Sequence, residues 1–151
     1  MTIRIDIDDP NKPDIVALLR DGETYGASLY PAESNHFMAL DALAARNVRF
    51  VVARDKEGVA VGTGALALFD GWAELKRRVI PSARGLGISR AILADLEARA
   101  RSAGITLIRL ETGVKNHEAI ALYERSGFTR CNPFADYRPD PLSLFMQKVI
   151  G

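Results

Sequence analysis

A short segment with two glycines, residues 84–89 (RGLGIS), has the composition of a binding site for an anionic group. It follows a run that reads as the end of a strand, and it precedes apolar residues at helical spacing. Such a junction leaves several backbone N–H groups unpaired at the helix N-terminus, with the positive end of the helix dipole behind them. Gly85 and Gly87 would let the backbone approach a phosphate closely. The same pattern is common in tight strand–helix packing, so the loop alone leaves both interpretations open.

A dinucleotide-binding fold of the Rossmann type is disfavoured as the setting for this loop. That fingerprint belongs to the first strand–helix unit of a chain and needs an acidic residue at the end of the next strand. Here the loop lies past the middle of the chain, and only a few short elements follow it. A chain of this size with a pyrophosphate-binding loop is expected to be a small-molecule enzyme.

Composition limits the remaining function classes. The chain has 151 residues, 48% of them hydrophobic, and this length and composition fit one domain. Its formal net charge of +1 at pH 7 gives nucleic-acid binding no support. No apolar run approaches the roughly 20 residues of a transmembrane helix, and the first ten residues lack the apolar stretch of a signal peptide. Cys131 is the single cysteine, so no internal disulfide can form, and this fits a reducing cytoplasm. With no cluster of His and Cys, we expect no metal site.

Hydrophobic periodicity and turn residues predict the elements that position the loop. Strands are expected at 2–7, 48–53, 59–69, 72–80, 106–111 and 144–150, with one more from residue 128. Asp70-Gly71 is a strong hairpin signal. Four helices are expected. The first begins at residue 13 and loosens at Gly22 and Gly26, and the second follows a cap at Ser34. The third runs from the glycine loop to about residue 104, and the fourth from about 116 to 125. The order of elements favours a mixed sheet flanked by helices.

Four segments together carry a family resemblance: the VIP strand end, RGLGIS, LIRLETG and NHEAIALYERSGF. They resemble the GNAT superfamily of N-acetyltransferases, closely over the last half of the chain and in element order over its whole length. The resemblance implies one N-acetyltransferase domain spanning 1–151 with the GNAT fold, an α/β (α+β) architecture. Its central sheet is mixed and mostly antiparallel, has about seven strands, splays at its centre and is flanked by about four helices.

A narrower resemblance comes from YPAESNH, AELKR, LETG and the tail CNPFADY followed by SLFMQK. These segments look like a subgroup of small bacterial acetyltransferases of mostly unassigned substrate, sometimes labelled indole-acetic-acid acetyltransferase-like. In the loop, the family pattern is Gln/Arg-x-x-Gly-x-Gly/Ala. Arg84 and Gly87 match it, whereas Ser89 stands where Gly or Ala is usual. Ser is small, and its hydroxyl can donate to a phosphate oxygen.

The resemblance implies acetyl-CoA as the acetyl donor, and no metal. The pyrophosphate would lie on backbone N–H groups of the loop, namely those of Arg84, Gly85, Leu86, Gly87, Ile88 and Ser89. The pantetheine arm would pair with the backbone of Val79 and Ile80, where two central parallel strands splay apart. Asn116 is expected either to cap the helix that it begins or to bind pantetheine.

The resemblance also suggests the catalytic groups. Tyr123 would protonate the leaving CoA thiolate, and the alternative is an aromatic that packs the helix on the sheet. Glu74 would take the proton of the attacking amine, directly or through water. The alternative for Glu74 is an ion-pair ladder, because Lys76 and Arg78 should share its strand face by period two.

The acceptor site is less well defined. Glu111 is an alternative base or a group that binds a cationic substrate, and Glu33 and His36 lie where the fold covers the acceptor. We expect direct attack of an acceptor amine on the thioester, with a small molecule favoured over a protein. The alternative is a non-catalytic acyl-CoA-binding regulatory module. The identity of the acceptor and the formation of a homodimer are left open.

Overall fold

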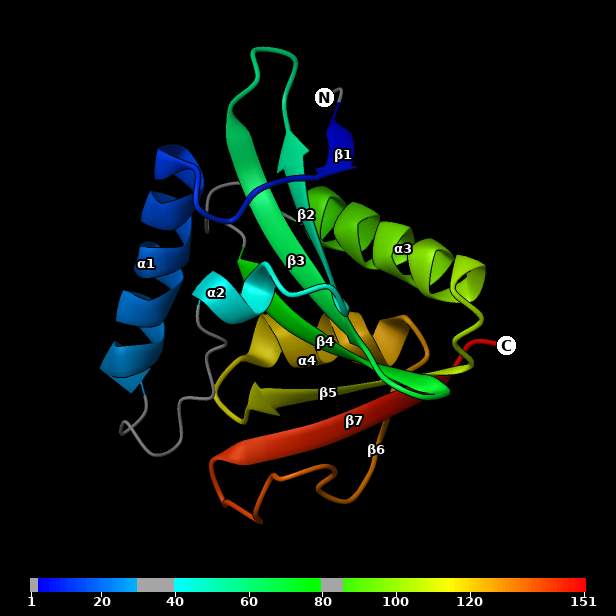
Figure 1. The fold of residues 1–151 in the computed structure, drawn as a ribbon. Helices are drawn as coiled ribbons and strands as arrows, with labels where there is room; N and C mark the ends of the chain where they lie inside the picture. Colours follow the sequence, from blue (N-terminus) through cyan, green and yellow to red (C-terminus); the bar gives the residue numbers. More distant parts are fainter. Residues whose placement is uncertain (1–2, 30–39, 80–85) are drawn as a thin grey trace.

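A seven-stranded mixed sheet, ordered β1-β2-β3-β4-β5-β7-β6, forms the centre of the computed structural model, which describes residues 3–29, 40–79 and 86–151 (Figure 1). The strands are β1 (Arg4–Ile7), β2 (Val48–Arg54), β3 (Ala60–Leu68), β4 (Trp72–Val79), β5 (Leu107–Gly113), β6 (Thr129–Arg130) and β7 (Ser143–Val149). The helices are α1 (Pro13–Leu29), α2 (Leu40–Leu43), α3 (Leu86–Ser102) and α4 (His117–Arg125). Of the pairs formed by these strands, β4 and β5 run parallel and the others antiparallel. The expected mixed, mostly antiparallel sheet is therefore confirmed.

Local sequence signals account for several of these elements. At the expected hairpin, the N–H of Phe69 donates to the carbonyl of Trp72 at 2.8 Å, and Gly71 adopts a positive φ of 81° that suits glycine. The expected loosening of the first helix at Gly22 and Gly26 is wrong, because α1 continues to Leu29. Tertiary packing of its buried Ile15 outweighs the weak helix propensity of two glycines. The expected cap at Ser34 lies outside the described residues.

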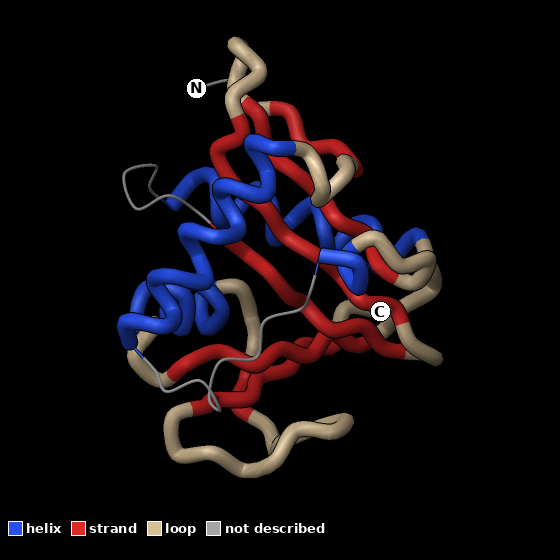
Figure 2. The backbone as a smooth tube through the Cα atoms, turned by 60° about the vertical axis from the view of Figure 1, so that its left-hand side comes forward, coloured by secondary structure: helices blue, strands red, loops and turns tan. Residues whose placement is uncertain are grey.

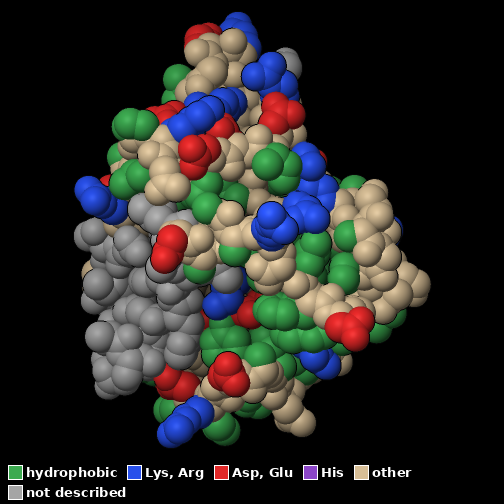
Figure 3. Space-filling view, in the orientation of Figure 1, with side chains coloured by type: hydrophobic (Ala, Val, Ile, Leu, Met, Phe, Trp, Pro, Cys, Tyr) green, Lys and Arg blue, Asp and Glu red, His purple; other side chains and the backbone are tan. Residues whose placement is uncertain are grey.

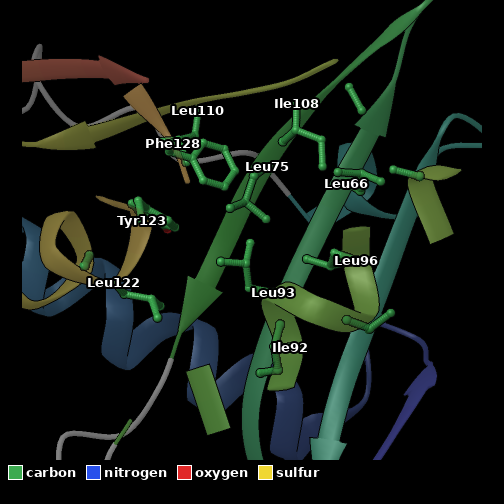
Figure 4. Close-up of a cluster of buried hydrophobic side chains, with 14 of the residues drawn as sticks. Leu66, Leu75, Ile92, Leu93, Leu96, Ile108, Leu110, Leu122, Tyr123 and Phe128 are labelled. Atoms are coloured by element: carbon green, nitrogen blue, oxygen red, sulfur yellow. The ribbon is translucent and has the colours of Figure 1, made fainter. Parts of the chain in front are cut away.

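Helices cover both faces of the sheet (Figure 2). On one face, residues of α3 and α4 such as Ile92, Leu96 and Leu122 pack on Leu66 and Leu75 of the sheet (Figure 4). A smaller core on the other face is formed by α1, α2, β2 and β3, and its buried members are Ile15, Leu19, Leu43, Phe50, Val52 and Ala65. No described helix is long and apolar enough to cross a membrane.

Helix α3 approaches the sheet very closely at Gly64 of β3. A Cβ atom at this position would lie 2.7 Å from Cγ2 of Ile92 and 3.0 Å from Cδ1 of Leu96. The other end of α3 is joined to β7 by an ion pair, in which Nζ of Lys148 contacts Oε1 of Glu97 at 2.8 Å. These contacts fix the helix whose first turn carries the glycine loop.

The two central parallel strands separate towards their C-terminal ends. Their pairing runs from Trp72 with Leu107 to Leu75 with Leu110 and then stops, although β4 continues to Val79 and β5 to Gly113. On the other side of β4, Val79 pairs with Thr63 but Lys76 pairs with Ala65 of β3, so β4 carries one extra residue there. Such a bulge bends a strand and increases its twist. The expected splay at the sheet centre is confirmed.

Candidate active site

The splay leaves backbone groups of β4 without a β5 partner at the position of Val79. An extended ligand can pair with such groups as an added strand would. Val79 therefore lies where the sequence analysis expects the pantetheine arm, whereas Ile80, Arg84 and Gly85 lie outside the described residues.

The first turn of α3 contains the second half of the glycine loop, Leu86 to Ser89. The N–H groups of a first turn have no acceptor within the helix and point outward from its end. Ile88 of this turn is buried in the core, and Ser89 is also buried. A Cβ at Gly87 would meet no described atom within 4 Å, and its φ is not in the left-handed region. Neither packing nor the backbone of the described protein requires glycine at position 87.

Tyr123 lies on the α4 side of the sheet, at the point where β4 and β5 begin to separate. Its side chain is 5% exposed, and its ring centroid lies 5.6 Å from that of Phe128. Figure 4 shows Tyr123 and Phe128 gathered with Leu75 and Leu110, the last residues at which β4 and β5 pair. This placement fits both the packing interpretation and a hydroxyl group near the gap.

Asn116 does not cap α4 with its side chain. Its Nδ2 instead donates to Oγ1 of Thr112 on β5 at 3.3 Å. The capping interpretation is therefore wrong. The side chain joins the helix start to β5, because the short turn between them brings the two residues together.

Glu74 is buried on the opposite face of the sheet from Tyr123. Its neighbours Ala73 and Leu75 point into the core beneath α3 and α4, so by strand alternation Glu74 points to the other side. Oε2 of Glu74 lies 3.4 Å from Nζ of Lys76, which confirms that these two share a face. The side chain of Arg78, expected on the same face, lies outside the described ones.

Tyr137 is a partner of Glu74 that the sequence analysis missed. Its hydroxyl donates to Oε2 of Glu74 at 2.5 Å, across 63 positions of the chain. Burial raises the pKa of Tyr137 well above its usual range, and the charges of Glu74 and Glu111 and the hydrogen bond to Glu74 add to the rise. The residue belongs to CNPFADY, a segment that carried the narrower resemblance without indicating a role for any of its residues.

Glu111 lies on the same face as Glu74, since its neighbour Leu110 also points into the core beneath α3 and α4. It pairs with Phe145 of β7, and Oγ of Ser143 donates to its Oε2 at 2.7 Å. The structure thus brings two carboxylates and a phenol together on one side of the splayed strands. Figure 3 shows acidic and basic side chains set among hydrophobic ones near the centre of this face. Glu33 and His36, expected beside them, lie outside the described residues.

A hollow of about 460 Å³ lies next to this cluster, under the connection between β6 and β7. It is lined by Arg109, Arg130, Cys131, Asn132, Pro133, Phe134 and Gln147, and so contains neither carboxylate. Burial raises the pKa of the Cys131 thiol despite the opposing charge of Arg109, which fits the expected structural role of this cysteine. Among the described residues, no group of three His, Cys, Asp or Glu side chains could hold a metal ion.

Comparison with known proteins places this geometry in a family. The model of the acetyltransferase (GNAT) family matches residues 13–128. An IAA acetyltransferase of Azospirillum brasilense is 45% identical over 144 residues, which cover 93% of this chain and 94% of that protein. An N-acetyltransferase of Bacillus subtilis, YsnE, is 33% identical over 152 residues, covering 98% of this chain and all of that protein.

Solved structures share the fold over nearly the whole chain. A Klebsiella pneumoniae protein described as an acyl-CoA N-acyltransferase superposes with a TM-score of 0.84 at 35% identity, covering 99% of this chain and 98% of that one. PaiA N-acetyltransferase from Thermoplasma acidophilum, in complex with coenzyme A, superposes with a TM-score of 0.77 at 17% identity, covering 99% of both chains. The chain belongs to the GNAT family, and it is an acyltransferase that transfers an acetyl group.

Proposed function

We propose that this protein is an acetyl-CoA-dependent N-acetyltransferase in which a small acceptor amine attacks the thioester directly. The observation that carries the proposal is the end of β4–β5 pairing at Leu75 and Leu110, since the two strands separate directly beyond Glu74 on one face and beside Tyr123 on the other. A thioester held in that gap is accessible from both faces. A single domain spanning the chain would supply all the groups used.

The donor would be held mainly through backbone groups. Its pyrophosphate would accept hydrogen bonds from the N–H groups at the start of α3, where a Cβ at Gly87 would meet no described atom within 4 Å. Arg84 and Gly85 would complete this loop, and the backbone of Val79 and Ile80 would pair with the pantetheine arm. Asn116, whose Nδ2 contacts Thr112, would offer its amide oxygen to the same arm.

The chemistry is a proton-coupled acyl transfer. The amine nitrogen bonds to the carbonyl carbon, the C–S bond breaks, and the electron pair goes to sulfur. Tyr123 would give its hydroxyl proton to the leaving thiolate, and Glu74 would take a proton from the amine through a water molecule. Orienting both substrates in the gap would supply much of the acceleration.

The second carboxylate suggests what kind of acceptor fits. Glu111 and Glu74 place two acidic groups on one side of the gap, with Lys76 beside Glu74. A protonated amine would be attracted to such a site, with Glu111 binding the cation while Glu74 receives the proton. We propose a cytoplasmic location, in which the lone thiol of Cys131 would stay reduced.

The test is release of free CoA thiol from acetyl-CoA with a panel of acceptors: lysine, putrescine, spermidine, ethanolamine, benzylamine, a peptide with a free N-terminus, and IAA. We expect turnover with at least one small amine and mass-spectrometric detection of its N-acetyl product. Turnover with IAA or the peptide alone would contradict the proposed acceptor class. Binding of acetyl-CoA without thiol release in any reaction would contradict direct amine attack.

A further inference from the structure

We propose that Tyr137 is a positioning residue for Glu74, one that holds one carboxylate oxygen so that the other receives the amine proton. The inference rests on the proposed role of Glu74 as base. Tyr137 itself need not touch either substrate.

The contacts of Glu74 are divided unequally between its two oxygens. The Tyr137 hydroxyl donates to Oε2 at 2.5 Å, and the ammonium of Lys76 lies 3.4 Å from the same atom. No described residue donates a hydrogen bond to Oε1. A carboxylate held through one oxygen has a fixed orientation, and its other oxygen remains available as a proton acceptor.

Tyr137 is suited to a permanent donor role. Its side chain is half-buried, and burial together with the negative charges of Glu74 and Glu111 raises the pKa of its phenol. A phenol with a raised pKa keeps its proton throughout the pH range in which an amine is acetylated. Its hydroxyl therefore keeps the proton that it donates to Glu74.

The ring of Tyr137 is itself held in place on several sides. The ring meets those of Phe134 and Phe145 edge to face, at centroid distances of 5.2 Å and 5.4 Å. Nζ of Lys76 lies 5.3 Å from the centroid of the Tyr137 ring. Its backbone N–H donates to the carbonyl of Phe134 at 3.1 Å, closing a turn in which Ala135 has a φ of 51°. A non-glycine residue at positive φ is a strained feature that packing must maintain. The turn thus aims the hydroxyl with little freedom.

The other described charged groups on this face do not replace Tyr137. Glu111 is bound by Ser143, and Arg109, the β5 residue paired with Glu74, places its guanidinium over the rings of Trp72 and Phe134 at 5.1 Å and 5.9 Å. Lys76 is the only described cation in contact with Glu74. The ammonium of Lys76 also lies over the Tyr137 ring, so that ring helps to hold it beside the carboxylate. Loss of the hydroxyl alone would therefore leave Lys76 as the one described residue that holds the carboxylate.

The kinetic test compares Tyr137→Phe with Glu74→Gln and the double variant, using the fastest amine of the panel. Tyr137→Phe keeps the ring and its contacts, so we expect kcat to fall about 10-fold with an unchanged KM for acetyl-CoA. The acidic limb of the kcat/KM profile should move to higher pH, because the ionised carboxylate loses a donor. In the Glu74→Gln background, Tyr137→Phe should change kcat less than about 2-fold.

Phe134→Leu is the matched control for packing. It loosens the same aromatic cluster but leaves the hydroxyl, so we expect a lower melting temperature with a smaller shift of the acidic limb than in Tyr137→Phe. If Tyr137→Phe were fully active while Glu74→Gln was impaired, the positioning role of Tyr137 would be overturned and the proposed role of Glu74 as base would stand. Equal losses from Tyr137→Phe in both backgrounds would overturn it too, whereas a fully active Glu74→Gln would overturn the proposed base.

A second measurement needs no acceptor. With tyrosine labelled by ¹³C at Cζ, Tyr137→Phe identifies the Tyr137 signal among the four tyrosines. We expect that signal to remain that of a protonated phenol up to about pH 11 and to change on Glu74→Gln. An unchanged signal in Glu74→Gln would mean that the hydrogen bond is absent in solution and would refute the inference.

Discussion

Replacing Gly87 by Ala should have opposite effects on the free protein and on its complex with acetyl-CoA. Gly87 is the second residue of α3, its φ is not left-handed, and a Cβ there meets no described atom within 4 Å. Alanine is the better helix former by up to about 1 kcal/mol. For a chain of this size, 1 kcal/mol corresponds to about 2–4 °C, so the melting temperature of the free protein should rise by up to about 4 °C.

The complex should lose more than the free protein gains. Acetyl-CoA at about 100 times its Kd would stabilise the wild type by about 2.7 kcal/mol, or about 5–11 °C. A methyl group at Gly87 would push the pyrophosphate away from an N–H group and weaken a charge-assisted hydrogen bond of about 1.5–3 kcal/mol. The Kd would then rise about 10-fold or more, and the ligand-induced shift at the same concentration would fall to about half or less.

Thermal unfolding with and without acetyl-CoA measures both effects in one experiment. Ala98→Gly is a matched control, because residue 98 is exposed on the same helix and lies three turns from the loop. It should lower the melting temperature of the free protein and leave the ligand-induced shift intact. Gly87→Glu, which adds bulk and negative charge, should abolish the shift. A wild-type shift in both Gly87 variants would refute the placement of the pyrophosphate at this loop.

Three further substitutions test the chemistry and the packing. Tyr123→Phe should lower turnover on the order of 10²-fold with little change in acetyl-CoA affinity, and full activity would mean that water protonates the thiolate. Glu74→Gln should lower turnover mainly at neutral pH. A pH–rate profile should show this loss shrinking as the pH rises and the free amine becomes abundant, whereas a loss independent of pH would point to substrate positioning. Gly64→Ala should destabilise the protein by about 1–3 kcal/mol in denaturant unfolding, because its Cβ would lie 2.7 Å from Ile92; an unchanged midpoint would argue against this close approach of α3.

Elements defined by local patterns could be predicted from the sequence. The hairpin at Asp70-Gly71 and the helix after the glycine loop follow from turn chemistry and helical spacing, and both are present. The splay was expected only through the family resemblance, because no local pattern marks where two parallel strands stop pairing. The bulge between Lys76 and Val79 was not anticipated, because no local pattern marks it.

The wrong expectations share a physical cause, since each applied a residue's intrinsic preference where a specific contact in the fold decides. Two glycines weaken a helix in isolation, but α1 is held by Ile15 in the core between the helix and the sheet. Asn is a favoured N-cap residue, but Asn116 finds Thr112 at the end of the preceding strand. Tyr137 could not be assigned at all, because its partner Glu74 lies 63 positions away and the intervening chain determines whether they meet.

The two faces of the sheet explain why the splay matters for the proposed chemistry. Tyr123 belongs to the core beneath α3 and α4, whereas Glu74 and Tyr137 lie on the opposite side of the same strands. Backbone pairing of β4 and β5 to their ends would separate these groups by a closed layer. Because pairing stops at Leu75, the proposed mechanism would let the leaving sulfur of a thioester in the gap receive a proton from one face while the attacking amine loses a proton to the other. The proposed acid and base would then have different neighbours, the ring of Phe128 for Tyr123 and the polar groups of Tyr137 and Lys76 for Glu74, as two groups with opposite tasks require.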